Sequence, residues 1–223
     1  YNRMRGTTLG INEEFVAAPK LDDLECAYSS IEGMLNAKLS KDYVTVCAVF
    51  DNEEVGSGTK QGAGSTFFPE VLKRISYLSG KNEEEYYMAV ADSFMLSADN
   101  AHAVHPNYQD KTDPTNRPYI NEGIVLKYNA SQKYTTDANS AALVKYLCKK
   151  EKIKCQVFFN RSDMLGGSTL GNILTRQGSI KAADIGLPQL SMHSTYETAG
   201  CKDLDDMITL MESFYELGKE VQI

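Results

Sequence analysis

Apolar runs of strand length alternate with segments of helical periodicity along most of this 223-residue chain, and this alternation constrains the fold more than any other feature. The clearest strand prediction is residues 43–50, a nearly continuous β-branched and apolar run, typical of a strand covered on both faces. Residues 21–39 carry apolar side chains at helical spacing and acidic residues in the first turn, where the helix dipole favours them. The pattern predicts an α/β fold of three layers, α/β/α, around a mostly parallel central sheet.

The remaining predicted elements continue this order. Helices are expected at residues 65–78, 82–94, 136–153 and 203–221, and a shorter helix follows a glycine-flanked loop within 166–178. Strands are expected at residues 95–99, 123–129 and 155–160, and a last strand region within 182–192. Residues 107–121 are predicted to form a surface loop.

Charge and composition exclude several classes of function. The chain has 23 basic and 30 acidic residues, a net charge of −7 and no basic tract, which argues against a nucleic-acid partner. No apolar run is long enough to span a membrane. The five cysteines form no CxxC pair, so we expect reduced thiols and a cytoplasmic protein. Any site that uses imidazole must draw on His102, His105 or His193.

Acidic residues and a histidine follow several predicted strands directly. Glu53 and Glu54 come after the run at 43–50, Asp99 closes the strand at 95–99, and His193 follows the last strand region. Open α/β sheets place ligand sites at the carboxyl ends of their strands, so these side chains are expected at one edge. Asp22, at the start of a helix in the adjacent layer, could join them.

Carboxylates and imidazole together form a ligand set that suits Zn, Mn or Co, and a pair of such ions needs a bridging carboxylate. The adjacent pair of Glu53 and Glu54 then has a clear logic, since one carboxylate can bind metal while the other handles a proton. Each feature also has an ordinary explanation. A Glu-Glu pair on a loop is usually solvated, and His102 and His105 stand at i, i+3 rather than the i, i+4 spacing of the HExxH metalloproteases.

Several longer phrases of the sequence resemble the M18 family of metallo-aminopeptidases, in the order in which that family has them. They extend from about Glu13 to the C-terminus and read LDDL, FDNEEVGSG, SADNAHAVHPNY, KYNASQKY, GSTLGNI and DIGLPQLSMHS. The resemblance implies an α/β/α catalytic domain of the zinc-exopeptidase type, with an inserted β-rich domain.

The same resemblance implies a role for each candidate in a centre of two divalent ions, most simply zinc. Asp22 would bridge the two ions and Glu54 would be a terminal ligand. Asp99 would bind one ion and His193 the other. Glu53 would be the general base.

Three further residues correspond to the substrate pocket of the family. Lys127 would pair with an acidic side chain at the N-terminus of a peptide. A cation at the end of a strand would favour Asp or Glu there through a charge-assisted hydrogen bond. Taken alone, it could equally be a solubilising lysine at a strand edge. His102 and Tyr134 would line the same pocket.

The chain also departs from the family pattern. It lacks the HTD-type motif whose histidine supplies a fifth metal ligand, and the inserted domain is missing. We therefore expect residues 1–20 to be the remnant of an upstream or inserted domain and residues 21–223 to be the C-terminal part of the catalytic domain. Such a chain is predicted to bind its second metal weakly and to have little activity alone.

The leading hypothesis is an aminopeptidase that removes N-terminal residues from peptides, preferring Asp and Glu. Two alternatives remain open: a catalytically incomplete chain that acts as an assembly module, and another metallohydrolase, such as a deacylase, on the same fold. The resemblance also implies a homo-oligomer, since family members form dodecamers.

Overall fold

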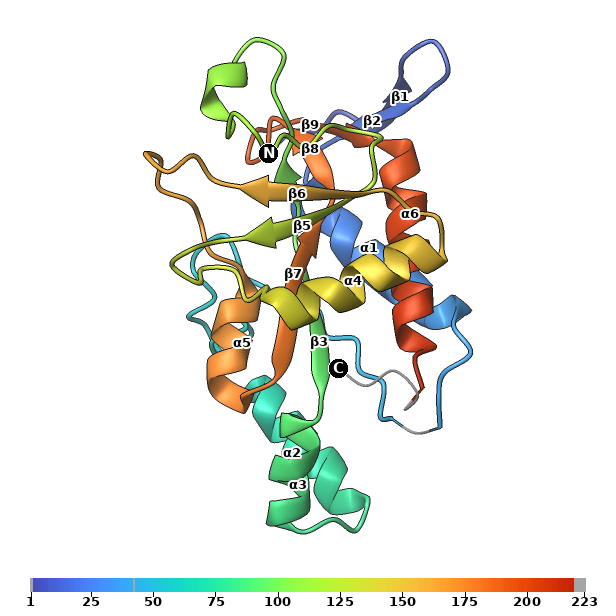
Figure 1. The fold of residues 1–223 in the computed structure, drawn as a ribbon, viewed down its shortest axis with the longest axis vertical. Helices are drawn as coiled ribbons and strands as arrows, with labels where there is room; N and C mark the ends of the chain where they lie inside the picture. Colours follow the sequence, from blue (N-terminus) through green and yellow to red (C-terminus); the bar gives the residue numbers. More distant parts are fainter. Residues whose placement is uncertain (1, 42, 219–223) are drawn as a thin grey trace.

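The computed structural model describes residues 2–41 and 43–218 of the chain. Its central sheet has four strands in the order β3-β7-β5-β6, which are Phe94–Ala98, Lys181–Gly186, Ile124–Tyr128 and Cys155–Phe159. The outer pairs, β3 with β7 and β5 with β6, are parallel, whereas β5 and β7 are antiparallel. The sheet is therefore mostly parallel, as predicted (Figure 1).

Helices flank both faces of this sheet. On one face, α1 (Leu21–Asn36), α4 (Ala138–Lys150) and α6 (Cys201–Tyr215) share the main hydrophobic core with Ile124 and Leu126 of β5. Val125 points to the opposite face, because side chains alternate along a strand, and it packs there against Tyr134 and other buried residues. Helix α5 (Leu170–Gly178) contacts β3 and β7. The predicted α/β/α class is thus confirmed.

The two remaining α-helices, α2 (Phe67–Leu78) and α3 (Glu83–Ala91), form a hairpin that projects from one end of the molecule (Figure 1). A short 3₁₀ helix, Gln109–Lys111, lies within the segment predicted to be a surface loop. None of the helices in the described residues is long and apolar enough to cross a lipid bilayer.

A second, mainly antiparallel sheet was not predicted. Its five strands, in the order β1-β2-β9-β8-β4, are Thr7–Leu9, Phe15–Ala18, Glu197–Gly200, Pro188–Leu190 and Ala101–His102. Each strand has only two to four residues, too few for a recognisable alternation of apolar and polar side chains. Residues 182–192, predicted as one strand region, in fact contribute to both sheets through β7 and β8.

The prediction of a strand at residues 43–50 is wrong. The structure assigns no strand to this segment, and Val44 (71% exposed) and Val49 (57% exposed) face solvent, although Cys47 packs against the main core. The run has the composition of a buried strand, but it pairs with neither edge strand of the central sheet, β3 or β6. The final predicted helix ends at Tyr215 rather than at 221, and residues 219–221 of that prediction lie outside the described residues.

Candidate metal centre

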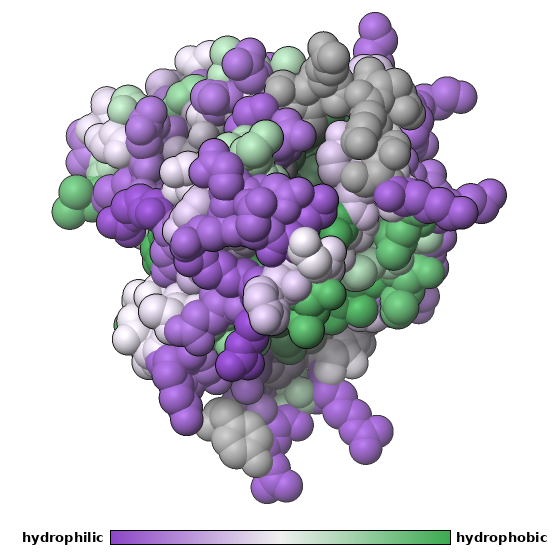
Figure 2. Space-filling view, turned by 90° about the horizontal axis from the view of Figure 1, so that it is seen from below, coloured by the Kyte–Doolittle hydropathy of each residue, from purple (hydrophilic) through white to green (hydrophobic). Residues whose placement is uncertain are grey.

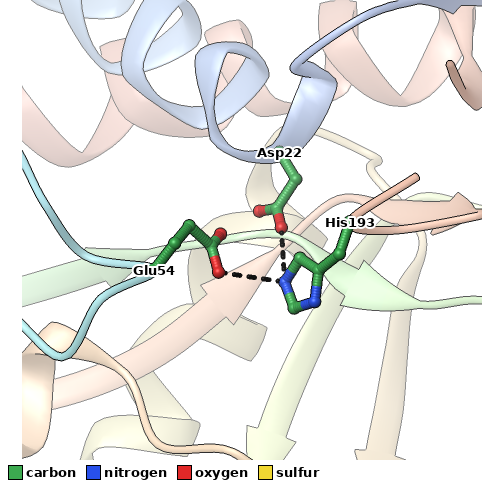
Figure 3. A group of neighbouring side chains, drawn as sticks. All are labelled: Asp22, Glu54 and His193. Atoms are coloured by element: carbon green, nitrogen blue, oxygen red, sulfur yellow. Dashed lines mark ion pairs between the residues drawn. The ribbon is translucent and has the colours of Figure 1, made fainter. Parts of the chain in front are cut away.

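Three candidate ligands from distant parts of the chain meet at one point. Asp22 lies at the start of α1, Glu54 lies in the loop after residues 43–50, and His193 lies between β8 and β9. His193 Nε2 is 3.2 Å from Asp22 Oδ2 and 3.1 Å from Glu54 Oε2 (Figure 3). Two carboxylates and one imidazole converge with separations that a single metal ion could bridge.

A second group of potential ligands adjoins the first and shares Asp22 with it. Asp22, Asp23 and Asp99 each offer an oxygen, and these oxygens lie within 4.8 Å of one another. Asp99 follows β3, as expected. Asp23 was not among the predicted site residues; its Oδ1 accepts a hydrogen bond from the N–H of Asn100. Asp22 therefore belongs to both groups of potential ligands.

The electrostatics of Asp22 test whether a cation fits. Burial, first of all, and the negative charges of Asp99 and Glu54 together raise its pKa to about 8. Its Oδ1 is buried and accepts no hydrogen bond. Burial and the charge of Asp99 likewise raise the pKa of Asp23. Clustered acids with an unpartnered buried oxygen are costly without a counter-charge, so these residues fit a divalent cation.

Lys127 supplies the only ammonium in contact with the acidic cluster among the described residues. It lies on β5 and is 2% exposed; its Nζ is 2.9 Å from Asp99 Oδ2 and 2.7 Å from the carbonyl oxygen of Asn100. Burial alone would lower its pKa, but the charges of Asp99 and Tyr134 outweigh burial and the pKa is raised. The lysine is thus charged and engaged with Asp99. Its predicted contact with a substrate carboxylate stays a prediction.

The other predicted residues lie around this cluster. Glu53 is half-buried, belongs to neither ligand group, and has a pKa raised to about 7 by burial and by the charges of Asp99 and Glu54. Tyr134 is buried with its ring 5.5 Å from Lys127 Nζ. His102 is exposed on β4. A pKa near neutrality outside the ligand set suits Glu53 to a role in proton transfer.

Comparison with known proteins decides the family. A family model described as Aminopeptidase I zinc metalloprotease (M18) matches residues 1–215. This chain belongs to the M18 family. The similarity suggested by the sequence phrases is therefore confirmed.

Individual M18 proteins show the extent of the match. A probable M18 family aminopeptidase 2 of Clostridium acetobutylicum is 45% identical over 217 residues, covering 97% of this chain and 50% of that protein. The solved S. cerevisiae mApe1 dodecamer has a TM-score of 0.83 and 30% identity, covering 97% and 49%. The M18 aminopeptidase of Thermotoga maritima gives 0.83 and 26%, covering 95% and 48%. The chain spans about half the length of the curated relatives that it matches.

Asp23 is the ligand candidate that sequence reasoning on this M18 chain missed. It stands beside Asp22 in the LDDL phrase, and the first-turn position suggested only an interaction with the helix dipole. In the structure, Asp22 and Asp23 have non-helical backbone angles, with ψ of 110° and 36°. This local departure from helical geometry lets adjacent acids both face the cluster. The doubled aspartate was the one available signal.

Proposed function

We propose that this chain is the ligand-bearing portion of a zinc-dependent aminopeptidase that hydrolyses peptides from their N-termini, with Asp and Glu preferred. One observation carries the proposal: Asp22 belongs to two adjoining ligand groups, one completed by Glu54 and His193 and the other by Asp23 and Asp99. A carboxylate shared in this way is the requirement of a two-metal hydrolase. Manganese or cobalt would suit the same ligands.

The two groups differ in how well they suit zinc. Asp22, Glu54 and His193 provide three ligands of the kind found in catalytic zinc sites, including an imidazole. The second group consists of carboxylates alone, and Lys127 already occupies an oxygen of Asp99. We therefore expect one tightly held ion and one weakly held ion per chain.

Zinc bound here would supply Lewis-acid polarisation of the scissile carbonyl and would lower the pKa of a nucleophilic water. The residues of the chain do the remaining work. Glu53, with a pKa near 7, can accept a proton from water and donate it to the departing amine. Asp22, Glu54 and His193 hold the cation. Lys127 is the cation that would favour an acidic N-terminal residue, in competition with Asp99.

Two substitutions test these roles. Glu53→Gln should leave zinc content unchanged and lower the rate by about 10²-fold or more, because it removes the proton acceptor and spares the ligands. Asp22→Ala should lose both zinc and activity. Zinc per chain is measured by elemental analysis after dialysis, and turnover is measured with aspartyl and leucyl peptides and with an N-acyl amino acid. Loss of zinc in Glu53→Gln would show that the roles are wrongly assigned, and turnover of the N-acyl substrate alone would indicate a deacylase.

An exposed apolar surface favours the alternative of an assembly module. Seen from below, apolar side chains gather on one side of the molecule (Figure 2). The large exposed apolar residues include Leu24 and Leu35 on α1 and Val44 and Val49 in the unpaired segment. Such surface is typical of an interface. A chain that self-associates but holds no zinc in the dialysis experiment would support this alternative over the enzyme.

A further inference from the structure

A buried glutamate outside the ligand groups connects two of the candidate ligands through their backbones. Glu197, the first residue of β9, is 2% exposed. Its Oε2 accepts the N–H of Asp22 at 3.0 Å, and its Oε1 accepts the N–H of His193 at 2.7 Å. One carboxylate thus links the start of α1 to the β8–β9 loop, at the residues whose side chains also meet.

Neither backbone is held at this point by regular secondary structure. Asp22 has φ and ψ of −83° and 110°, which are not helical. His193 has a φ of 65°, in the left-handed region that a residue with a side chain seldom adopts. Its side chain is 61% exposed, so packing does little to fix the imidazole. The two hydrogen bonds to Glu197 therefore restrain the backbone of both residues, and for His193 they act where packing of the side chain is weak.

We infer that Glu197 is a positioning residue that pre-organises Asp22 and His193 for a divalent cation, an inference that rests on the proposed metal-dependent function. Both of its oxygens are engaged by N–H donors, which leaves it in a supporting role rather than that of a ligand. Hydrogen-bond partners that orient ligands commonly contribute a factor of about 10–100 to metal affinity. Its negative charge, buried beside Asp22, adds to the attraction for a cation.

The chain contains a matched control for this role. Asp203, in the first turn of α6, is 1% exposed, and its two oxygens accept the N–H groups of Asn121 (2.5 Å) and Gly123 (2.7 Å). Like Glu197, it is a buried carboxylate that joins two backbone amides from another segment. Asp203 contacts none of the candidate ligands in either group. Glu197→Gln and Asp203→Asn make the same chemical change, because each replaces one acceptor oxygen by an NH₂ group that faces an N–H donor.

The experiment measures zinc affinity by competition with a chromogenic chelator, and the visible spectrum of the Co²⁺-loaded chain. Glu197→Gln should weaken zinc binding at least 10-fold and alter the Co²⁺ bands, whereas Asp203→Asn should leave both unchanged. Thermal melting in EDTA reports the structural cost of each substitution separately. If Glu197→Gln fails to fold, Glu197→Asp serves instead, since it keeps the charge but shortens the reach to one amide. Its zinc affinity should fall below that of the wild-type chain, and wild-type affinity would overturn the positioning role.

The possible failures are distinguishable. Wild-type zinc affinity and an unchanged Co²⁺ spectrum in the Glu197 variant would overturn the positioning role while leaving the proposed function intact. An equal loss of zinc affinity in Asp203→Asn would also overturn it, because the effect would then follow general destabilisation. A wild-type chain that binds no zinc would overturn the proposed function itself.

Discussion

Replacing Lys127 by Met should strongly destabilise the metal-free chain. The methylene groups keep their packing, but the ammonium is lost and with it the bonds to Asp99 Oδ2 (2.9 Å) and to the carbonyl oxygen of Asn100 (2.7 Å). The carboxylate of Asp99 is then left beside Asp22 and Asp23 with no positive neighbour in contact. Breaking a buried ion pair by removing one partner costs about 3–5 kcal/mol in the free energy of unfolding.

Urea unfolding in EDTA at neutral pH measures this loss. With a slope of about 2–3 kcal/mol per molar urea, the midpoint should fall by about 1–2.5 M. Lys145→Met is the control, because Lys145 is exposed on α4 and a surface substitution of this kind changes stability by at most about 0.5 kcal/mol. The double variant with Asp99→Asn should recover much of the loss, since the carboxylate that lacks a partner is then absent.

A loss below about 1 kcal/mol in Lys127→Met, or full additivity with Asp99→Asn, would refute this reasoning. It would mean that the ammonium contributes little to the folded chain and is available for another partner. The stability measurement thereby bears on the substrate hypothesis. A lysine that is ion-paired with Asp99 would have to interact with Asp99 and an acidic substrate at once. A lysine without a strong ion pair to Asp99 would be free to bind the substrate.

Two further predictions concern the helix pair and pH. Gly33→Ala should lower the free energy of unfolding by about 1–3 kcal/mol, because the added Cβ would lie 2.5 Å from Met211 Cβ and 2.9 Å from a backbone nitrogen of α6; Gly167→Ala, with no atom within 4 Å, should be near neutral in the same urea titration. Burial raises the pKa of Glu25 to about 8 from 4.5, so the folded chain retains a proton that the unfolded chain releases. The resulting stability is present below pH 4.5 and is lost as pH rises through about 8. The melting temperature of the metal-free chain should therefore fall between pH 5 and pH 8, and Glu25→Gln should reduce that slope; equal slopes in the two proteins would contradict the assignment.

The parts of the fold that sequence predicted well carry their signals locally. The helix predicted from residue 136 begins at Ala138, with Asp137 as its N-cap accepting the N–H of Ser140. The strand predicted at residues 123–129 is present as β5, and its residues Ile124 to Lys127 are buried. In each case the residues that determine the structure lie within a few positions of the element itself.

The segment at 43–50 shows the limit of such signals. Apolar β-branched residues indicate that a segment suits a buried strand, but a strand also needs a neighbour to accept its hydrogen bonds. Composition cannot reveal whether the chain provides that neighbour. The five short strands of the second sheet were missed for the opposite reason. Pairing with neighbouring strands makes them strands, while their own residues give little indication of strand structure.

The residues of the candidate site also divide into those that local sequence indicates and those that only the three-dimensional structure reveals. The rule that parallel strands deliver ligands at their carboxyl ends grouped Glu54, Asp99 and His193 in the sequence, and a helix start added Asp22. Only Asp99 follows a strand of the central sheet in the structure, because Glu54 follows a segment without strand structure and His193 follows β8 of the second sheet. Glu197 lay beyond that rule, because its place in the site depends on which backbone N–H groups its carboxylate reaches. Side chains that meet a ligand can be inferred from residue type and strand order. Side chains that restrain the backbone beneath a ligand act through φ and ψ, and these become visible only when the loops that carry them are placed in three dimensions.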